Sequence, residues 1–130
     1  MGTIKNFEDL EIWKKARIFS QLIFKYCVLN EKFQQHEKAQ IDRASSSVMD
    51  NIAEGFEREG NKEFINFLTI AKGSAAEVRS QLIRAKDKNY LDDETFIKLK
   101  NESIEISKSL SGFVNYLKKS NIKGNKFNQI

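Results

Sequence analysis

The amino-acid sequence predicts an all-α fold, a single-domain, antiparallel, up-and-down four-helix bundle. The chain has 130 residues, a length that fits one domain. It contains no proline and only six glycines, so it lacks the turn residues that an all-β fold needs. Hydrophobic residues make up 40% of the chain and charged residues 31%, and the apolar ones recur with helical spacing in four long segments.

The first predicted helix runs from about Phe7 to Leu29. Asn6 is its expected N-cap, because a short polar side chain there can accept a hydrogen bond from a free backbone N–H of the first turn. Acidic residues follow in the first turn, where the helix dipole favours negative charge. The apolar stripe expected to face the core consists of Ile12, Ala16, Phe19, Ile23 and Tyr26.

A polar segment, 30–36, reverses the chain before the second predicted helix, which runs from about 37 to 57. Its apolar row consists of Ile41, Ala44, Val48 and Ile52. Gly60 and Asn61 supply the next break, with Asn61 as the expected cap of a third helix from about 62 to 89. The stretch 71–76 of that helix is mostly small residues, which lets a neighbouring helix approach closely.

The fourth predicted helix runs from about 93 to 118, with Asp92 as its expected N-cap. Its core row repeats at alternating steps of four and three, a heptad pattern typical of packed helices: Leu99, Ser103, Ile106, Leu110, Phe113 and Leu117. Short connections between four long helices place sequential helices antiparallel. The remaining segment, 120–130, is rich in Lys and Asn, and we expect it to form a basic, disordered tail.

The sequence argues against an enzyme, a metalloprotein and a membrane protein. Cys27 is the only cysteine and His36 the only histidine, so a zinc cluster is not expected. Phe33 stands three residues before His36, where the Glu-x-x-His pair of a di-iron bundle would need a glutamate. We therefore expect no catalysis, no metal and no cofactor. No apolar run approaches the roughly 20 residues that span a bilayer, and no signal peptide is evident, so we expect a cytoplasmic protein.

The charge of the chain alternates along the sequence. The net charge is +4, and the acid-free segment 118–130 carries it through Lys118, Lys119, Lys123 and Lys126. The preceding segments 1–30, 31–60, 61–90 and 91–117 are basic, acidic, basic and acidic in turn. This alternation would let a basic helix of one copy meet an acidic helix of the next. Such a head-to-tail contact closes into a ring when the rotation between copies allows it.

The third predicted helix carries the strongest candidate for binding nucleic acid. Lys72, Arg79 and Lys86 recur every seven residues and therefore share a face. Further cations that could join them are Arg84, Lys88, Lys118 and Lys119. Clustered cations on an accessible surface are what phosphate binding requires. The alternative is an ordinary solvated face whose positive charge complements the C-terminal end of the helix dipole.

Polar residues interrupt the apolar rows of the second and third predicted helices. Arg43, Asn51 and Glu54 fall in the second helix, and Glu77 and Gln81 fall one turn apart in the third. One interpretation is a ligand or partner site at one end of the bundle. The other, which we favour, is a buried network of ion pairs and amides that fixes helix register or a subunit interface.

Several sequence motifs together resemble the family of four-helix bundles encoded within intervening sequences of bacterial 23S ribosomal RNA genes. The motifs are Phe7-Glu8-Asp9-Leu10-Glu11-Ile12-Trp13, Asn51-Ile52-Ala53-Glu54-Gly55-Phe56, Glu63-Phe64, Phe67-Leu68, Ala71, Gly73-Ser74, Glu77, Tyr90-Leu91 and Leu110 with Gly112-Phe113. Two positions depart from the family pattern. Met49 stands where a proline is usual, and Asp42 replaces the first of two paired arginines.

The family is similar in fold to the accessory variability determinant of diversity-generating retroelements, a pentameric ring that associates with nucleic acid and a reverse transcriptase. The resemblance therefore implies a homopentamer with RNA or DNA as a partner. Together with the residues above, it predicts a non-enzymatic scaffold that binds nucleic acid through repeated basic surfaces. The alternative is a protein–protein interaction module with no role in nucleic-acid binding.

Overall fold

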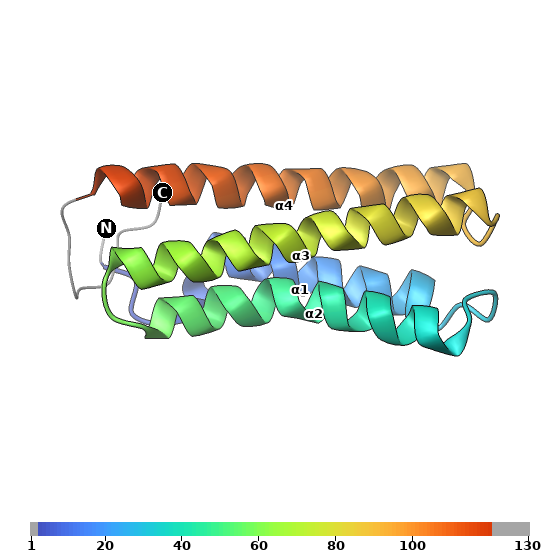
Figure 1. Cartoon of the computed structure of the whole chain (residues 1–130), viewed down its shortest axis with the longest axis horizontal. Coiled ribbons are helices and arrows are strands. Elements are labelled where there is room, and N and C mark those ends of the chain that lie inside the picture. Colours follow the sequence, from blue (N-terminus) through green and yellow to red (C-terminus); the bar gives the residue numbers. More distant parts are fainter. Residues whose placement is uncertain (1–2, 121–130) are drawn as a thin grey trace.

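Four helices lie side by side with sequential helices antiparallel, which confirms the predicted fold class (Figure 1). The computed structural model describes residues 3–120, so most of the predicted tail lies outside the described residues. The helices are α1 (Glu11–Ile23), α2 (Gln35–Glu57), α3 (Asn61–Asp87) and α4 (Asp93–Lys119). The start of α1 and the end of α4 lie at the same end of the bundle. No helix within residues 3–120 is long and apolar enough to cross a membrane.

A single apolar core runs along the bundle and is built from the rows that the helical period predicts. The buried residues of α4 are the six predicted ones: Leu99, Ser103, Ile106, Leu110, Phe113 and Leu117. Packing is most extensive between α2 and α3 and between α3 and α4. Burying one large apolar side chain contributes about 1.5–3 kcal/mol, so these rows dominate the stability of the fold.

The first predicted helix, from Phe7 to Leu29, is not continuous in the structure. A 3₁₀ turn, η1 (Phe7–Asp9), is followed by an extended Leu10 with φ −71° and ψ 129°, and only then does α1 begin. The extended backbone turns the Leu10 side chain into the core, where it is 2% exposed. Asn6 makes no side-chain cap hydrogen bond, because the break at Leu10 separates it from α1.

The C-terminal end of the same segment is a π-helix, η2 (Phe24–Val28). There the backbone N–H of Leu29 donates to the carbonyl of Phe24, five residues earlier. In this wider turn Cys27 is fully buried, and Tyr26, which was predicted to face the core, is partly buried and packs against it. Burial raises the pKa of the Cys27 thiol to about 12, which leaves it an inert apolar side chain.

A buried carboxylate joins α2 to the turn between α3 and α4. Glu37 closes a capping box with Gln34 at the start of α2. It also accepts hydrogen bonds from Lys88 Nζ at 2.7 Å and from the Tyr90 hydroxyl at 2.9 Å. The hydrogen bond from Lys88, followed by the one from the Gln34 backbone, lowers the pKa of Glu37 to about 2. Glu37 is therefore an ionised anchor at this end of the bundle.

The two other helix starts differ from each other. Asp92 caps α4 by accepting a hydrogen bond from the Thr95 backbone N–H at 2.8 Å, as predicted. Asn61, the expected cap of α3, instead lies inside its first turn, and Gly60 takes the cap position with a φ of +85°. The Asn61 side chain donates to the carbonyl of Leu117 at 2.9 Å, which ties the start of α3 to the end of α4.

Candidate nucleic-acid interface

An open groove of about 580 Å³ runs between α3 and α4 on the outside of the bundle. The α3 side of the groove is formed by Lys72, Ala76 and Arg79. The α4 side is formed by Ile104, Ser107, Lys108, Ser111, Gly112 and Asn115. We call this feature the basic groove, because three of its side chains are cations and none is acidic.

The three cations of the basic groove have no counter-ion within residues 3–120. Lys72 and Arg79 lie two turns apart on α3, a separation of about 10 Å along the helix axis. Lys108 reaches the same groove from α4, and no Asp or Glu side chain of the described chain forms an ion pair with any of the three. Unpaired like charges around a concave surface create a positive potential that attracts anions.

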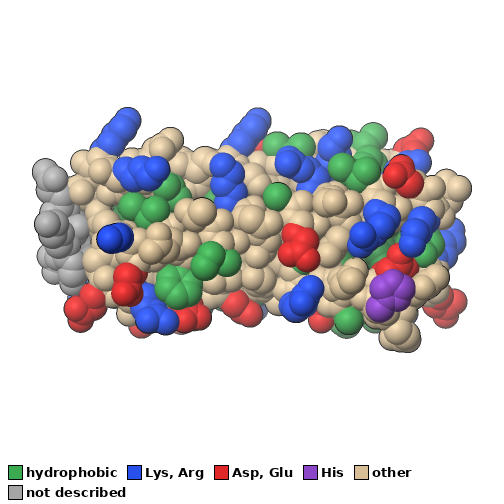
Figure 2. Space-filling view, viewed as in Figure 1, with side chains coloured by type: hydrophobic (Ala, Val, Ile, Leu, Met, Phe, Trp, Pro, Cys, Tyr) green, Lys and Arg blue, Asp and Glu red, His purple; other side chains and the backbone are tan. Residues whose placement is uncertain are grey.

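The wider surface has the same asymmetry. Figure 2 shows Lys and Arg side chains projecting mainly from the half of the molecule formed by α3 and α4, whereas acidic side chains gather along the α2 edge. The acidic residues that the sequence places in segment 91–117 therefore do not make the α4 side of this face negative. The basic groove lies within the positive half.

Sequence reasoning missed the α4 wall of the groove. Ile104, Lys108, Ser111 and Asn115 step by four, three and four residues, so they occupy one face of α4. The helical period could have identified this face as solvent-facing. The period alone could not show that it lies opposite Lys72 and Arg79, because the register between α3 and α4 is set by core packing.

The remaining predicted cations lie outside the basic groove. Lys86 Nζ pairs with Asp93 Oδ1 at 2.9 Å, and Lys88 Nζ pairs with Glu37 Oε2 at 2.7 Å. The hydrogen bond to Glu37 raises the pKa of Lys88. Arg84 makes a long hydrogen bond of 3.4 Å to Gln40 across to α2. These three cations therefore serve contacts within the bundle.

Lys118 and Lys119 occupy the last turn of α4, where both are exposed and suit the negative end of the helix dipole. Lys118 borders a separate hollow of about 500 Å³ that it shares with Gly60, Asn61 and Lys62 at the start of α3. The seven predicted cations thus separate into two in the basic groove, three in bundle contacts and two at the end of α4.

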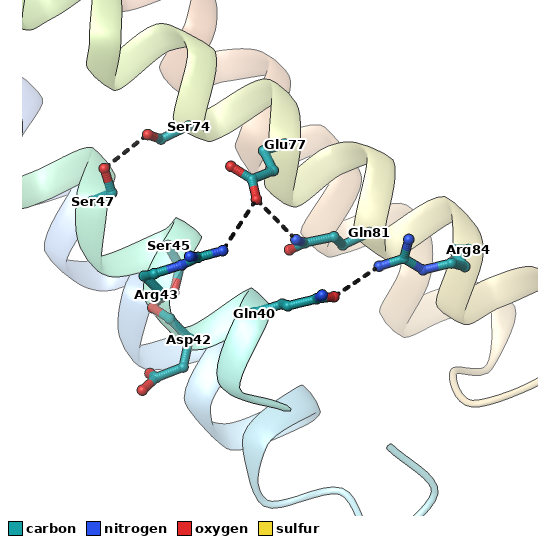
Figure 3. Close-up of polar contacts among 9 residues, drawn as sticks. All are labelled: Gln40, Asp42, Arg43, Ser45, Ser47, Ser74, Glu77, Gln81 and Arg84. Atoms are coloured by element: carbon teal, nitrogen blue, oxygen red, sulfur yellow. Dashed lines mark hydrogen bonds and ion pairs between the residues drawn. The ribbon is translucent and has the colours of Figure 1, made fainter. Parts of the chain in front are cut away.

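A second set of polar side chains crosses between α2 and α3, and Figure 3 shows its contacts. We call it the α2–α3 seam. Arg43 Nη2 lies 3.8 Å from Glu77 Oε2, which also accepts a hydrogen bond from Gln81 at 3.2 Å. Ser47 and Ser74 are hydrogen-bonded at 2.9 Å. Glu77 of the seam therefore has one partner on the facing helix and one on its own.

The seam differs from the buried network that the sequence predicted. The side chains of Arg43 and Glu77 are 73% and 49% exposed, so their ion pair lies in solvent. Asn51 donates to the carbonyl and hydroxyl of Ser47 on its own helix. Glu54 pairs with Arg58 at 2.8 Å, also within α2. Arg43, Glu77 and Gln81 thus form one contact group across the seam, Asn51 joins the seam through the Ser47–Ser74 hydrogen bond, and Glu54 forms a local pair on α2.

Within residues 3–120, no group of three or more His, Cys, Asp and Glu side chains is placed to hold a metal ion. The basic groove also lacks the paired acid and base that proton transfer requires. Its lining offers ammonium, guanidinium, hydroxyl and amide groups as hydrogen-bond donors.

Comparison with known proteins places the chain in a family. A sequence model described as 23S rRNA-intervening sequence protein matches residues 8–112. A crystal structure of a protein of unknown function, from the S23 ribosomal protein family of Bacteroides thetaiotaomicron VPI-5482, is 28% identical with a TM-score of 0.73. That similarity covers 79% of this chain and 97% of that chain. No curated protein matches. The chain belongs to the 23S rRNA-intervening sequence protein family.

Proposed function

We propose that the protein is a non-enzymatic, homo-oligomeric scaffold that binds RNA or DNA through the basic groove. The observation that carries this proposal is the unpaired state of Lys72, Arg79 and Lys108 around one open channel. Lys86 and Lys88 differ from these three cations, because each forms an ion pair within the bundle. Phosphate groups are the ligands that such clustered cations suit best.

Assembly of several copies would strengthen weak phosphate contacts by repeating them. Three cations per groove give modest affinity, and simultaneous contacts in one assembly raise it without any new chemistry. Our expectation of a pentamer rests on the resemblance of the sequence to ring-forming relatives. Ile18 and Phe24, which are 53% and 48% exposed on α1 and η2, offer apolar surface that contact between copies would cover.

The proposal is tested by the affinity for a structured RNA, measured by fluorescence anisotropy over a salt series. Light scattering on the same samples gives the number of copies. The test variant combines Lys72→Glu, Arg79→Glu and Lys108→Glu. We expect it to lose about 100-fold or more in affinity, because it replaces three attractive phosphate contacts with repulsive ones.

A matched control reverses the same number and type of charges elsewhere. Lys5→Glu, Lys32→Glu and Lys98→Glu change three exposed lysines that form no ion pair within residues 3–120, do not line the basic groove and lie outside α1 and η2. We expect this variant to bind RNA within about threefold of the wild-type protein once the general effect of net charge is allowed for. Equal loss in both variants would show that binding follows net charge and not the groove.

The alternative function is a protein-interaction module, and exposed isoleucines favour it. Ile70, Ile83 and Ile97 are 51%, 42% and 54% exposed on α3 and α4. A protein that assembles but does not bind RNA even at low salt would contradict the nucleic-acid proposal. That result would make these apolar residues the first place to look for a protein partner.

A further inference from the structure

We infer that the basic groove holds the phosphate backbone of a nucleic-acid duplex and does not read its bases. This inference rests on the proposed function and specifies which form of nucleic acid the groove fits. It follows from the chemistry of the groove lining, from the rigidity of the two helices that form it, and from the accessible backbone at Gly112.

The groove lining contains no aromatic side chain. Proteins that hold single strands stack the bases on aromatic rings, which contribute about 1–3 kcal/mol for each base. Several aromatic residues of the bundle instead pair with one another, as in Phe64 with Phe113 in the core and Phe33 with Tyr90 at one end. A single strand in the basic groove would therefore gain phosphate contacts but no stacking.

The cations are attached to two packed helices, so their backbone positions are fixed relative to each other. Lys72 and Arg79 are about 10 Å apart along α3, and Lys108 approaches from the opposite wall. A fixed set of cations binds best to phosphates that are already fixed in space. A duplex presents such phosphates, whereas a single strand must lose conformational entropy to match them.

The uncharged polar groups of the lining suit backbone contacts better than base contacts. Ser107 and Ser111 are hydroxyl donors, which commonly contact phosphate oxygens and sugars. Asn115 is the only lining residue with the amide geometry that reads adenine in a bidentate manner. Discrimination between base pairs needs several such contacts, so we expect affinity to be nearly independent of duplex sequence.

The α4 backbone is accessible at Gly112. Apart from the surrounding backbone of α4 and the two neighbouring residues, a Cβ atom added there would have no heavy atom of the described chain within 4 Å. Glycine inside a helix costs about 1 kcal/mol relative to alanine, and nothing in the packing of the bundle requires it at this position. An approaching phosphate backbone would benefit from the missing side chain.

The number of phosphate contacts can be counted from the dependence of affinity on salt. A hairpin of about 12 base pairs matches the roughly 40 Å length of α3, so it engages one groove. Three contacts predict a slope of about −3 in a plot of log affinity against log salt concentration. The variants Lys72→Gln, Arg79→Gln and Lys108→Gln should each make this slope shallower by about one unit.

The decisive experiment compares that hairpin with a single-stranded RNA of equal length and charge. We expect the hairpin to bind at least about tenfold more tightly, and a second hairpin of unrelated sequence to bind within about threefold of the first. The affinity for a DNA duplex shows whether the groove contacts phosphate alone or also the ribose 2′-hydroxyl. If DNA and RNA duplexes bind with equal affinity, the contacts are to phosphate alone. If DNA binds more weakly, the hydroxyl groups of the groove also contact the ribose 2′-hydroxyl.

Filling the groove provides an independent test. Gly112→Leu should lower affinity for the hairpin by about tenfold, whereas Gly73→Leu should leave it unchanged. Gly73 is the matched control, because it is also exposed inside a helix and also has no heavy atom within 4 Å of an added Cβ, but it does not line the groove. Circular dichroism and light scattering would show that both variants keep their fold and their number of copies.

Failure of this inference can be told apart from failure of the proposed function. If single strands bind as tightly as the hairpin and the glutamine variants weaken both, the groove binds nucleic acid but the duplex inference is wrong. If the hairpin binds and no groove variant changes its affinity or salt slope, another surface binds it, and both proposals about the groove are wrong.

Discussion

The two polar surfaces that border α3 differ in how their charges are balanced. In the α2–α3 seam, Arg43 faces Glu77 across the helix boundary, and Glu37 accepts from Lys88 at one end. In the basic groove between α3 and α4, Lys72 and Arg79 face Lys108 without an acid between them. One helix therefore presents a balanced surface on one side and an unbalanced surface on the other. Balanced charges can stabilise the fold, whereas unbalanced ones leave a positive potential that attracts anions.

Glycine is also used in opposite ways in the two regions. A Cβ added at Gly55 in α2 would lie 2.6 Å from the Cβ of Phe67 on α3, closer than atoms can pack. The missing side chain at Gly55 thus lets α2 and α3 approach each other. At Gly112 in the basic groove the space is open. Glycine therefore allows close helix packing in the seam and leaves the helix backbone accessible in the basic groove.

The largest expected effect on stability comes from removing the charge of Glu37. Glu37→Gln should lower the free energy of unfolding at neutral pH by about 1.5–3 kcal/mol, because it weakens charge-assisted hydrogen bonds at a buried position. The pKa of Glu37 is lowered to about 2 in the folded protein from an ordinary 4.5. Its contribution is therefore complete above about pH 4.5 and is lost as the pH falls towards 2.

Urea unfolding of the wild-type protein and of Glu37→Gln over this pH range checks the prediction. The difference in unfolding free energy should shrink with falling pH and nearly vanish near pH 2. Glu31→Gln, at an exposed glutamate in the preceding turn, is the control and should change stability little. A difference for Glu37→Gln that stays constant with pH would mean that shape, and not charge, makes residue 37 important.

The next largest effect concerns the closeness of α2 and α3. Gly55→Ala should destabilise the protein by about 1–2 kcal/mol. Overpacking costs about 1–3 kcal/mol, and the higher helix propensity of alanine offsets part of this cost. Phe67 cannot move its Cβ out of the way without moving α3. The measurement is the midpoint of urea unfolding. A Gly55→Ala protein as stable as wild type would show that α2 and α3 can separate at little cost.

The sequence predicted the parts of the fold that depend on local periodicity. The row from Leu99 to Leu117 is regular, and all six of its members are buried as expected. The break at Leu10 has no local signal, because nothing in the residues from Phe7 to Asp9 disfavours a helix. It depends on the core, which holds the Leu10 side chain only if the backbone is extended. Tertiary packing thus decided the one element that was predicted wrongly.

The candidate site was predictable on one wall only. The seven-residue spacing identified Lys72 and Arg79, since both lie on one helix. The same spacing included Lys86, which the structure places against Asp93 at the start of α4. That ion pair depends on the turn between two helices, and the position of Lys108 depends on their register. Neither can be obtained from the period of a single helix.

A smaller, stabilising effect is expected at Gly112 in the basic groove. Gly112→Ala should raise the free energy of unfolding by up to about 1 kcal/mol, because alanine favours the helix and its methyl group would clash with no side chain of residues 3–120. Thermal unfolding should show a higher midpoint than for wild type. A destabilised Gly112→Ala protein would mean that the position is constrained by contacts between copies, and the mutant should then also differ in light scattering.

The smallest expected effect lies in the exposed part of the seam. Arg43 and Glu77 are 3.8 Å apart with side chains 73% and 49% exposed, so solvent and salt screen their attraction. A double-mutant cycle with Arg43→Ala and Glu77→Ala should give a coupling energy below about 0.5 kcal/mol. The groove variant Lys72→Gln should likewise leave stability nearly unchanged, although it weakens RNA binding.

A large coupling energy between Arg43 and Glu77 would contradict the conclusion that this ion pair lies in solvent, because it would show that the pair is desolvated in the native assembly. The seam, and not the apolar surface of α1, would then be the better candidate for the contact between copies.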